Sequence, residues 1–280
     1  MRTPASLFIS AFVVGSLLPW SAEPALAQSD EQPAKSVSAE LLLRAAESAY
    51  RRDVARARAA GTLEVDGRSL SELRSALNPL VVGARTLRPE ADSWRWEISL
   101  EKRDEPVAYC LPGGKILVTT GLVDRPRLTS AERVAIVAHA IAHALAGHDA
   151  DEAEARLQST GGASNPDPNR VVLRLTDILA KVIVSEPHPV SSERAADALA
   201  LELMARSGLD PGVSVEAWRK VARGGGATPP GFLSLHPTWT ERLAELEARL
   251  PEMMPLYEGT SRERPVVPAP VLPPAAPATR

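Results

Sequence analysis

The sequence predicts an α+β fold, mainly helical, with a small β-sheet beside a central helix that carries two histidines. Apolar residues recur at helical spacing over most of the chain, whereas residues 94–120 contain short segments with period two. The segment His139-Ala140-Ile141-Ala142-His143 lies within an apolar helical stripe. With 280 residues, 44% hydrophobic content and a net charge of -3, we expect one core and no nucleic-acid partner.

The N-terminal residues have the pattern of a secretory signal peptide. Arg2 precedes an apolar run over residues 7–20, and Ala25-Leu26-Ala27 precedes Gln28. The apolar run is shorter than the roughly 20 residues that span a bilayer, which disfavours the alternative of an uncleaved membrane anchor. We therefore expect residues 1–27 to be a cleaved signal peptide, and a periplasmic mature chain without a transmembrane helix.

Residues 28–92 are expected to form N-terminal covering helices. Apolar residues recur at helical spacing between positions 38 and 60, and a second helical pattern extends from about residue 66 to 87. Residues 94–100 alternate with period two, and residues 106–111 and 115–120 have the pattern of two further strands. Pro112-Gly113-Gly114 supplies a turn between the last two strands.

The histidine segment is predicted to lie inside a helix with defined ends. Thr129 and Glu132 form a capping-box pattern, and the apolar stripe continues to Gly147. Further helices are expected over residues 171–184, from Ser191 or Ser192 to Arg206, and over 238–250. Residues 251–280 are rich in Pro and Ala and are expected to form a disordered tail.

His139 and His143 have the spacing of two zinc ligands. Residues i and i+4 share one face of a helix, so both imidazoles can reach one tetrahedral ion. A catalytic zinc normally takes three protein ligands, and Glu193 is the strongest candidate for the third. Asp197 lies one turn further on the same face, so one carboxylate can bind the metal while the other orients an imidazole.

Four segments, taken in order, resemble metallopeptidase family 48, the HtpX and BepA type of zinc endopeptidase related to CAAX prenyl proteases. These are residues 108–122, the histidine helix with Ala146-Gly147-His148, residues 193–211, and Leu233-Ser234-Leu235-His236-Pro237 with Arg242. The resemblance covers residues 93–250. With no transmembrane pair beside the motif, the soluble periplasmic branch is the more similar one.

The resemblance implies a gluzincin-like metallopeptidase domain over residues 93–250, with one Zn²⁺ bound by His139, His143 and Glu193. It implies that Asp197 contacts a side chain that binds the metal. It also implies that His236 lies near the metal, where it stabilises an oxyanion or acts as a removable fourth ligand. It also implies that the strand over residues 115–120 is the sheet edge that receives an unfolded protein substrate as an added β-strand.

Ala140 departs from the family pattern, which has a glutamate there that takes a proton from zinc-bound water. Alanine has no such group, and acid/base catalysis contributes about 10²- to 10⁴-fold in rate, so we expect impaired peptidase activity. Glu132, Asp149 and Glu152 are weaker candidates for a replacement base. His148 and His188 are disfavoured as ligands.

Two functions stay open. The first is a secreted zinc endopeptidase for unfolded or misassembled envelope proteins, either weakly active or carrying an introduced alanine. The second is a catalytically inactive pseudopeptidase that serves as a periplasmic chaperone or adaptor.

Overall fold

The computed structural model of the chain describes residues 37–65, 67–124, 128–162, 167–185, 188–224 and 239–263. The α+β fold is confirmed, because helices predominate around a small mixed sheet. The expected signal peptide, residues 1–27, and His236 lie outside the described residues. Among the helices that the structure describes, none is both long enough and apolar enough to cross a membrane.

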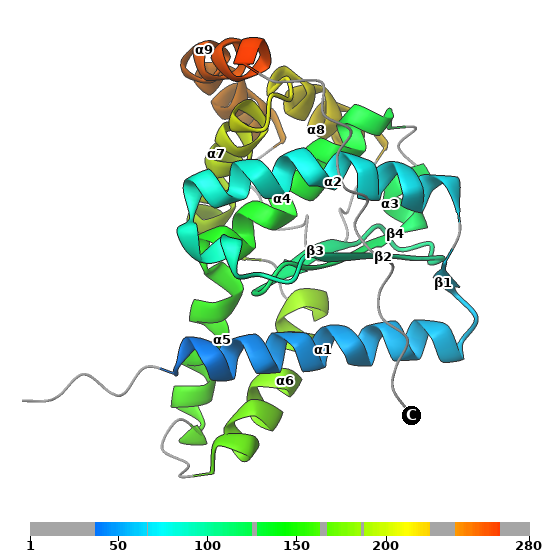
Figure 1. Cartoon of the computed structure of the whole chain (residues 1–280), viewed down its shortest axis with the longest axis vertical. Helices are drawn as coiled ribbons and strands as arrows, with labels where there is room; N and C mark the ends of the chain where they lie inside the picture. Colours follow the sequence, from blue (N-terminus) through cyan, green and yellow to red (C-terminus); the bar gives the residue numbers. More distant parts are fainter. Residues whose placement is uncertain are drawn as a thin grey trace, which may run out of the picture. The chain divides into compact units, whose positions relative to one another are not determined.

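The helices and strands follow one another along the chain as in Figure 1. The helices are α1 (Ala39–Ala59), α2 (Arg68–Leu87), the 3-10 helix η1 (Pro89–Asp92), α3 (Thr120–Asp124), α4 (Ser130–Ala146), α5 (His148–Ser159), α6 (Pro168–Ser185), α7 (Val190–Arg206), α8 (Gly212–Gly224) and α9 (Trp239–Glu263). The strands are β1 (Leu63–Glu64), β2 (Glu97–Glu101), β3 (Ala108–Leu111) and β4 (Lys115–Thr119). The sequence patterns did not predict β1, η1, α3, α5 or α8.

The sheet has the strand order β1-β2-β4-β3, so β4 is an inner strand and β3 is an edge. Strand β2 pairs with β4 in parallel, with Ile98 opposite Ile116. Strand β3 pairs antiparallel with the other side of β4, with Tyr109 opposite Leu117. The expectation that residues 115–120 form the open edge is therefore wrong, because β2 and β3 occupy both hydrogen-bonding sides of that strand.

Helices cover both faces of this sheet (Figure 1). Ile116 and Val118 belong to an apolar cluster with residues of α2, α4, α7 and α8, whereas Leu117 packs with residues of α1 and α6. Successive side chains of a strand point to opposite faces, so the buried residues of β4 divide between the two layers. This explains why β4 is buried throughout instead of alternating with polar residues.

Helix α4 has the ends that its sequence predicts. The Thr129 side chain accepts a hydrogen bond from the Glu132 backbone N–H, and Glu132 Oε2 accepts one from the Thr129 N–H at 2.7 Å. Burial raises the pKa of Glu132, but hydrogen bonds from Lys220 and Thr129 outweigh burial and leave this pKa lowered. Gly147, with φ 81°, ends α4 and turns the chain directly into α5.

Small residues bring α7 close to α4. Ala142 of α4 forms an apolar cluster with Ala196 and Ala200 of α7, and all three are buried. Short side chains at a helix crossing let the two backbones approach, and this packing places Glu193 and Asp197 opposite the histidines of α4.

Helix α9 extends to Glu263, so residues 251–263, which composition assigned to a disordered tail, are helical. Pro251 and Pro255 lie inside the helix. Leu250 and Met253 pack against the main apolar cluster, and we attribute the persistence of the helix past two prolines to this packing.

Candidate metal centre

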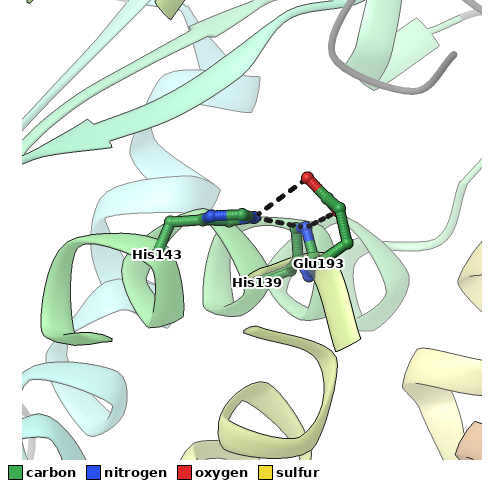
Figure 2. A group of neighbouring side chains, drawn as sticks. All are labelled: His139, His143 and Glu193. Atoms are coloured by element: carbon green, nitrogen blue, oxygen red, sulfur yellow. Dashed lines mark hydrogen bonds and ion pairs between the residues drawn. The ribbon is translucent and has the colours of Figure 1, made fainter. Parts of the chain in front are cut away.

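Two histidines of α4 and one glutamate of α7 direct their polar atoms at a common point (Figure 2). His139 Nε2 lies 3.1 Å from His143 Nε2. Glu193 Oε2 is 3.3 Å from His139 Nε2, and Glu193 Oε1 is 3.4 Å from His143 Nε2. All three residues are buried. Among the described residues, they are the one group of this kind whose donor atoms gather closely enough to bind one metal ion.

The contacts within the donor group are close to the spacing of zinc ligands. With metal–ligand bonds of about 2.0–2.1 Å, two ligand atoms of a tetrahedral site lie roughly 3.3 Å apart. The two imidazole nitrogens lie 3.1 Å apart, and the two carboxylate oxygens of Glu193 lie 3.3 and 3.4 Å from one imidazole each, so each contact is close to that spacing. Two imidazoles and one carboxylate also form a donor set typical of a catalytic zinc with an open fourth position.

The electrostatics of the cluster favour a bound cation. Burial raises the pKa of Glu193, but its contacts with His139 and His143 outweigh burial and hold this pKa far below the ordinary value. Burial lowers the pKa of His143 to about 4, so its imidazole is neutral near pH 7 and has a lone pair to donate. Burial also lowers the pKa of His139, but hydrogen bonds to Asp197 and Glu193 outweigh it and raise this pKa.

Asp197 and Arg242 support His139 at its Nδ1, while Nε2 faces Glu193. His139 Nδ1 lies 2.9 Å from Asp197 Oδ1. The buried guanidinium of Arg242 donates to both oxygens of Asp197, at 2.7 and 2.6 Å, and its Cζ lies 3.9 Å from the centre of the Trp218 ring. Burial raises the pKa of Asp197, but Arg242 and His139 outweigh burial and lower it. Asp197 is thus a buried carboxylate that fixes one imidazole.

Two further histidines surround His143. His148 Nδ1 lies 3.1 Å from His143 Nδ1. The ring of His188 stacks on that of His143 with centroids 4.3 Å apart, and His188 Nε2 lies 3.2 Å from Asp149 Oδ1. Neither His148 nor His188 belongs to the donor group above, in line with the preference for Glu193 over both.

A cavity of about 40 Å³ opens between the donor group and the edge strand β3. Its lining includes His139, His143 and Glu193, together with Ala140 and Asp149; the other lining residues are Ala108, Tyr109, Cys110, Val182 and His188. Ala140 therefore borders the space next to the donor atoms. Asp149 borders it too, whereas Glu132 caps the start of α4 and Glu152 lies beside His188, with Oε2 3.8 Å from the His188 Nδ1.

Sequence reasoning missed the contacts of Arg242, His148 and His188. The family resemblance includes Arg242 and His148 in its segments but indicates no contact for either side chain. The His188-Pro189 dipeptide indicated the start of a helix, because proline often precedes one. Its spacing from α4 gave no reason to place the His188 ring against His143.

Comparisons with known proteins agree with this geometry. The family model described as "Peptidase family M48" matches residues 71–250, from within α2 to α9. Proteins named mitochondrial metalloendopeptidase OMA1 are similar to the chain. The one from Saccharomyces cerevisiae is 28% identical over 183 residues, 60% of this chain and 50% of the relative.

The Arabidopsis thaliana protein of that name is 29% identical over 147 residues, 52% of this chain and 30% of the relative. The one from Schizosaccharomyces pombe is 27% identical over 174 residues, which are 56% of this chain and 48% of the relative. The chain thus spans half or less of the length of these curated relatives. The family match covers more than half of the chain and includes the donor group, and the chain belongs to Peptidase family M48.

Proposed function

We propose that the chain is a zinc-dependent metalloendopeptidase-type protein whose Zn²⁺ is held by His139, His143 and Glu193. The gathering of these donor atoms, with contacts of 3.1–3.4 Å between the three side chains, supports this proposal most strongly. Zn²⁺ at such a site supplies a Lewis acid and an activated water. The chain's own residues orient the ligands, and Asp197 with Arg242 holds His139 by its Nδ1.

Catalysis by this site is proposed to be impaired because Ala140 lacks a carboxylate. The family glutamate follows the first histidine and removes a proton from the metal-bound water. Ala140 borders the same cavity as the donors, so its methyl group occupies the place from which that carboxylate would act. Asp149 is a carboxylate on the cavity wall, but it lies 3.2 Å from His188 Nε2 and is engaged there.

A substrate is proposed to bind as an added strand on β3. Thr119 N–H donates to Val107 C=O, which sets the alternation of the β3–β4 ladder. By that alternation, the polar backbone groups of Tyr109 and Leu111 point to β4, and those of Ala108 and Cys110 point away from it. Ala108 and Cys110 also line the cavity at the donor group, so a strand paired there would pass beside the metal.

The substrates are proposed to be unfolded or misassembled envelope proteins, since pairing with an edge strand requires an extended backbone. The N-terminal pattern of residues 1–27 supports secretion to the periplasm and the soluble branch of the family. His236 is proposed to act near the metal, by the family resemblance alone. The alternative function, favoured by Ala140, is a pseudopeptidase that holds clients on β3 as a chaperone or adaptor.

Cleavage of an unfolded protein such as reduced casein tests the proposal. The mature chain, Ala140→Glu and the matched control Ala140→Gln would be compared with Zn²⁺ and with a chelator. We expect Ala140→Glu to exceed the unmodified chain by about 10²- to 10⁴-fold, and the control to show no gain, because Gln adds size without a base. The chelator should abolish all cleavage.

Three other outcomes have distinct meanings. If none of the variants cleaves but the unmodified chain suppresses aggregation of the unfolded protein, the pseudopeptidase function is supported. If the unmodified chain already cleaves as fast as Ala140→Glu, the proposed impairment is wrong and Asp149→Asn becomes the next variant. If the chain binds no Zn²⁺, the proposed metal centre is wrong. The codon at position 140 of the native gene would distinguish a natural alanine from an introduced one.

A further inference from the structure

The two imidazoles of the candidate metal centre, His139 and His143, use their ring nitrogens in the same way. Each directs Nε2 to Glu193, and each has a polar partner at Nδ1. For His139 that partner is Asp197, a carboxylate held by Arg242. For His143 the partner is His148, at 3.1 Å. The Nδ1 of one ligand histidine therefore contacts a charged carboxylate, and the Nδ1 of the other contacts a histidine.

The direction of the His143–His148 hydrogen bond follows from metal chemistry. An imidazole that binds a metal through Nε2 uses the lone pair of that nitrogen, so its proton is on Nδ1. The Nδ1–H of His143 then donates across 3.1 Å to the Nδ1 lone pair of His148, whose own proton is on Nε2. Because His143 is buried, a missing acceptor would leave an unsatisfied N–H in the interior.

The backbone places His148 for this contact. Gly147 adopts φ 81°, which ends α4 and begins α5 in a new direction, and His148 is the first residue of α5. The ring of His188 stacks on that of His143 with centroids 4.3 Å apart, and His188 Nε2 is itself engaged by Asp149. The ring of His143 is thus packed by one histidine and hydrogen-bonded by another.

We propose that His148 is a positioning residue of the metal centre, which accepts the Nδ1–H of His143 and thereby holds its Nε2 lone pair toward the ion. This inference rests on the proposed zinc site. It assigns to His148 the role for His143 that Asp197 has for His139. Partners of this kind typically contribute 10- to 100-fold to metal affinity.

Two substitutions separate a hydrogen-bonding role from a packing role. His148→Leu keeps an apolar side chain of similar bulk but removes the acceptor. His148→Asn places an amide oxygen near the position of the imidazole Nδ1, so it restores an acceptor on a smaller side chain. If only bulk mattered, Leu would be the better replacement; if the hydrogen bond matters, Asn would be.

The experiment measures Zn²⁺ affinity of the full chain by competition with a chromophoric chelator, and the visible spectrum of the Co²⁺ form. We expect His148→Leu to bind Zn²⁺ about 10- to 100-fold more weakly than the unmodified chain, and His148→Asn to recover most of that loss. The urea midpoints of the three metal-free proteins should agree, which separates affinity from folding. Equal Zn²⁺ affinity of His148→Leu and the unmodified chain, or weaker binding by Asn than by Leu, would overturn the inference.

A measurement on the unmodified chain keeps the inference testable if His148→Leu does not fold. In the Co²⁺ form, the Nδ1–H protons of both ligand histidines should give shifted exchangeable NMR signals, and both should exchange slowly because each is hydrogen-bonded. A rapidly exchanging Nδ1–H on His143 would contradict the role of His148 while leaving the zinc site intact. Failure of the unmodified chain to bind either metal would instead refute the proposed function.

Discussion

Arg242 is predicted to be one of the most destabilising positions to truncate. Its side chain is 2% exposed, it donates two hydrogen bonds to the buried Asp197, and it lies against Trp218. Replacing it with Met, as Arg242→Met, keeps much of the apolar stem but leaves the Asp197 carboxylate without its guanidinium.

The magnitude follows from burial. Removing one partner of a buried ion pair costs about 3–5 kcal/mol, because the other charge stays in the interior. Loss of the contact with Trp218 adds roughly 1 kcal/mol. His139, 2.9 Å from Asp197, can retain a proton and offset part of the cost. We therefore expect Arg242→Met to lower the free energy of unfolding by about 3 kcal/mol in the metal-free protein.

Urea unfolding followed by circular dichroism, with a chelator present, measures this loss. Arg68 pairs with Glu72 across one turn of α2 but is 93% exposed, so Arg68→Met is a matched control that should cost less than about 1 kcal/mol. The double variant Asp197→Leu/Arg242→Met should recover much of the stability, because it leaves no unpaired charge. A loss for Arg242→Met no larger than that of the control would refute this reasoning.

Two further predictions concern stability. Hydrogen bonds outweigh burial and lower the folded pKa of Glu132. Its contribution to the free energy of unfolding is therefore present above the unfolded carboxyl pKa of about 4.3 and is lost as pH falls through the folded pKa. Glu132→Gln should lower the urea midpoint at neutral pH, and the difference from the unmodified chain should vanish in acid. An equal difference at both pH values would contradict this assignment. A Cβ at Gly121 would collide with the backbone oxygen of Asp104, so Gly121→Ala should cost about 1–3 kcal/mol. In contrast, a Cβ at Gly259 in α9 meets no atom within 4 Å, so Gly259→Ala should be neutral or stabilising in thermal unfolding. Similar melting temperatures for the two alanine variants would show that the contact at Gly121 relaxes freely.

Local sequence patterns were sufficient to predict the histidine helix and the shared face of Glu193 and Asp197 on α7. The capping residues Thr129 and Glu132 and the four-residue spacing of His139 and His143 depend on the geometry of one helix, which sequence spacing expresses directly. The same spacing places Glu193 and Asp197 on one face of α7. Their approach to the histidines was inferred from the family resemblance, and the packing of α7 on α4 provides it.

Sequence periodicity could not predict which distant strands pair in the sheet. The pattern of residues 115–120 indicated a strand but not its neighbours, and the parallel pairing with β2 makes it an inner strand. Strand order depends on contacts between residues far apart in the chain, and an apolar run is compatible with an inner or an edge position. For this reason the proposed substrate strand moves from β4 to β3.

The sequence by itself determined the helical histidine pair, its capped ends and the α+β class, because each depends on residues within a few turns of one another. Only the tertiary structure decided which strand is the edge, that Arg242 holds Asp197, and that His148 and His188 surround His143. These contacts join segments brought together by folding of the core, and no local spacing encodes them. The chemistry of the centre thus depends on both, because the sequences of α4 and α7 supply the ligand side chains and the tertiary contacts orient them.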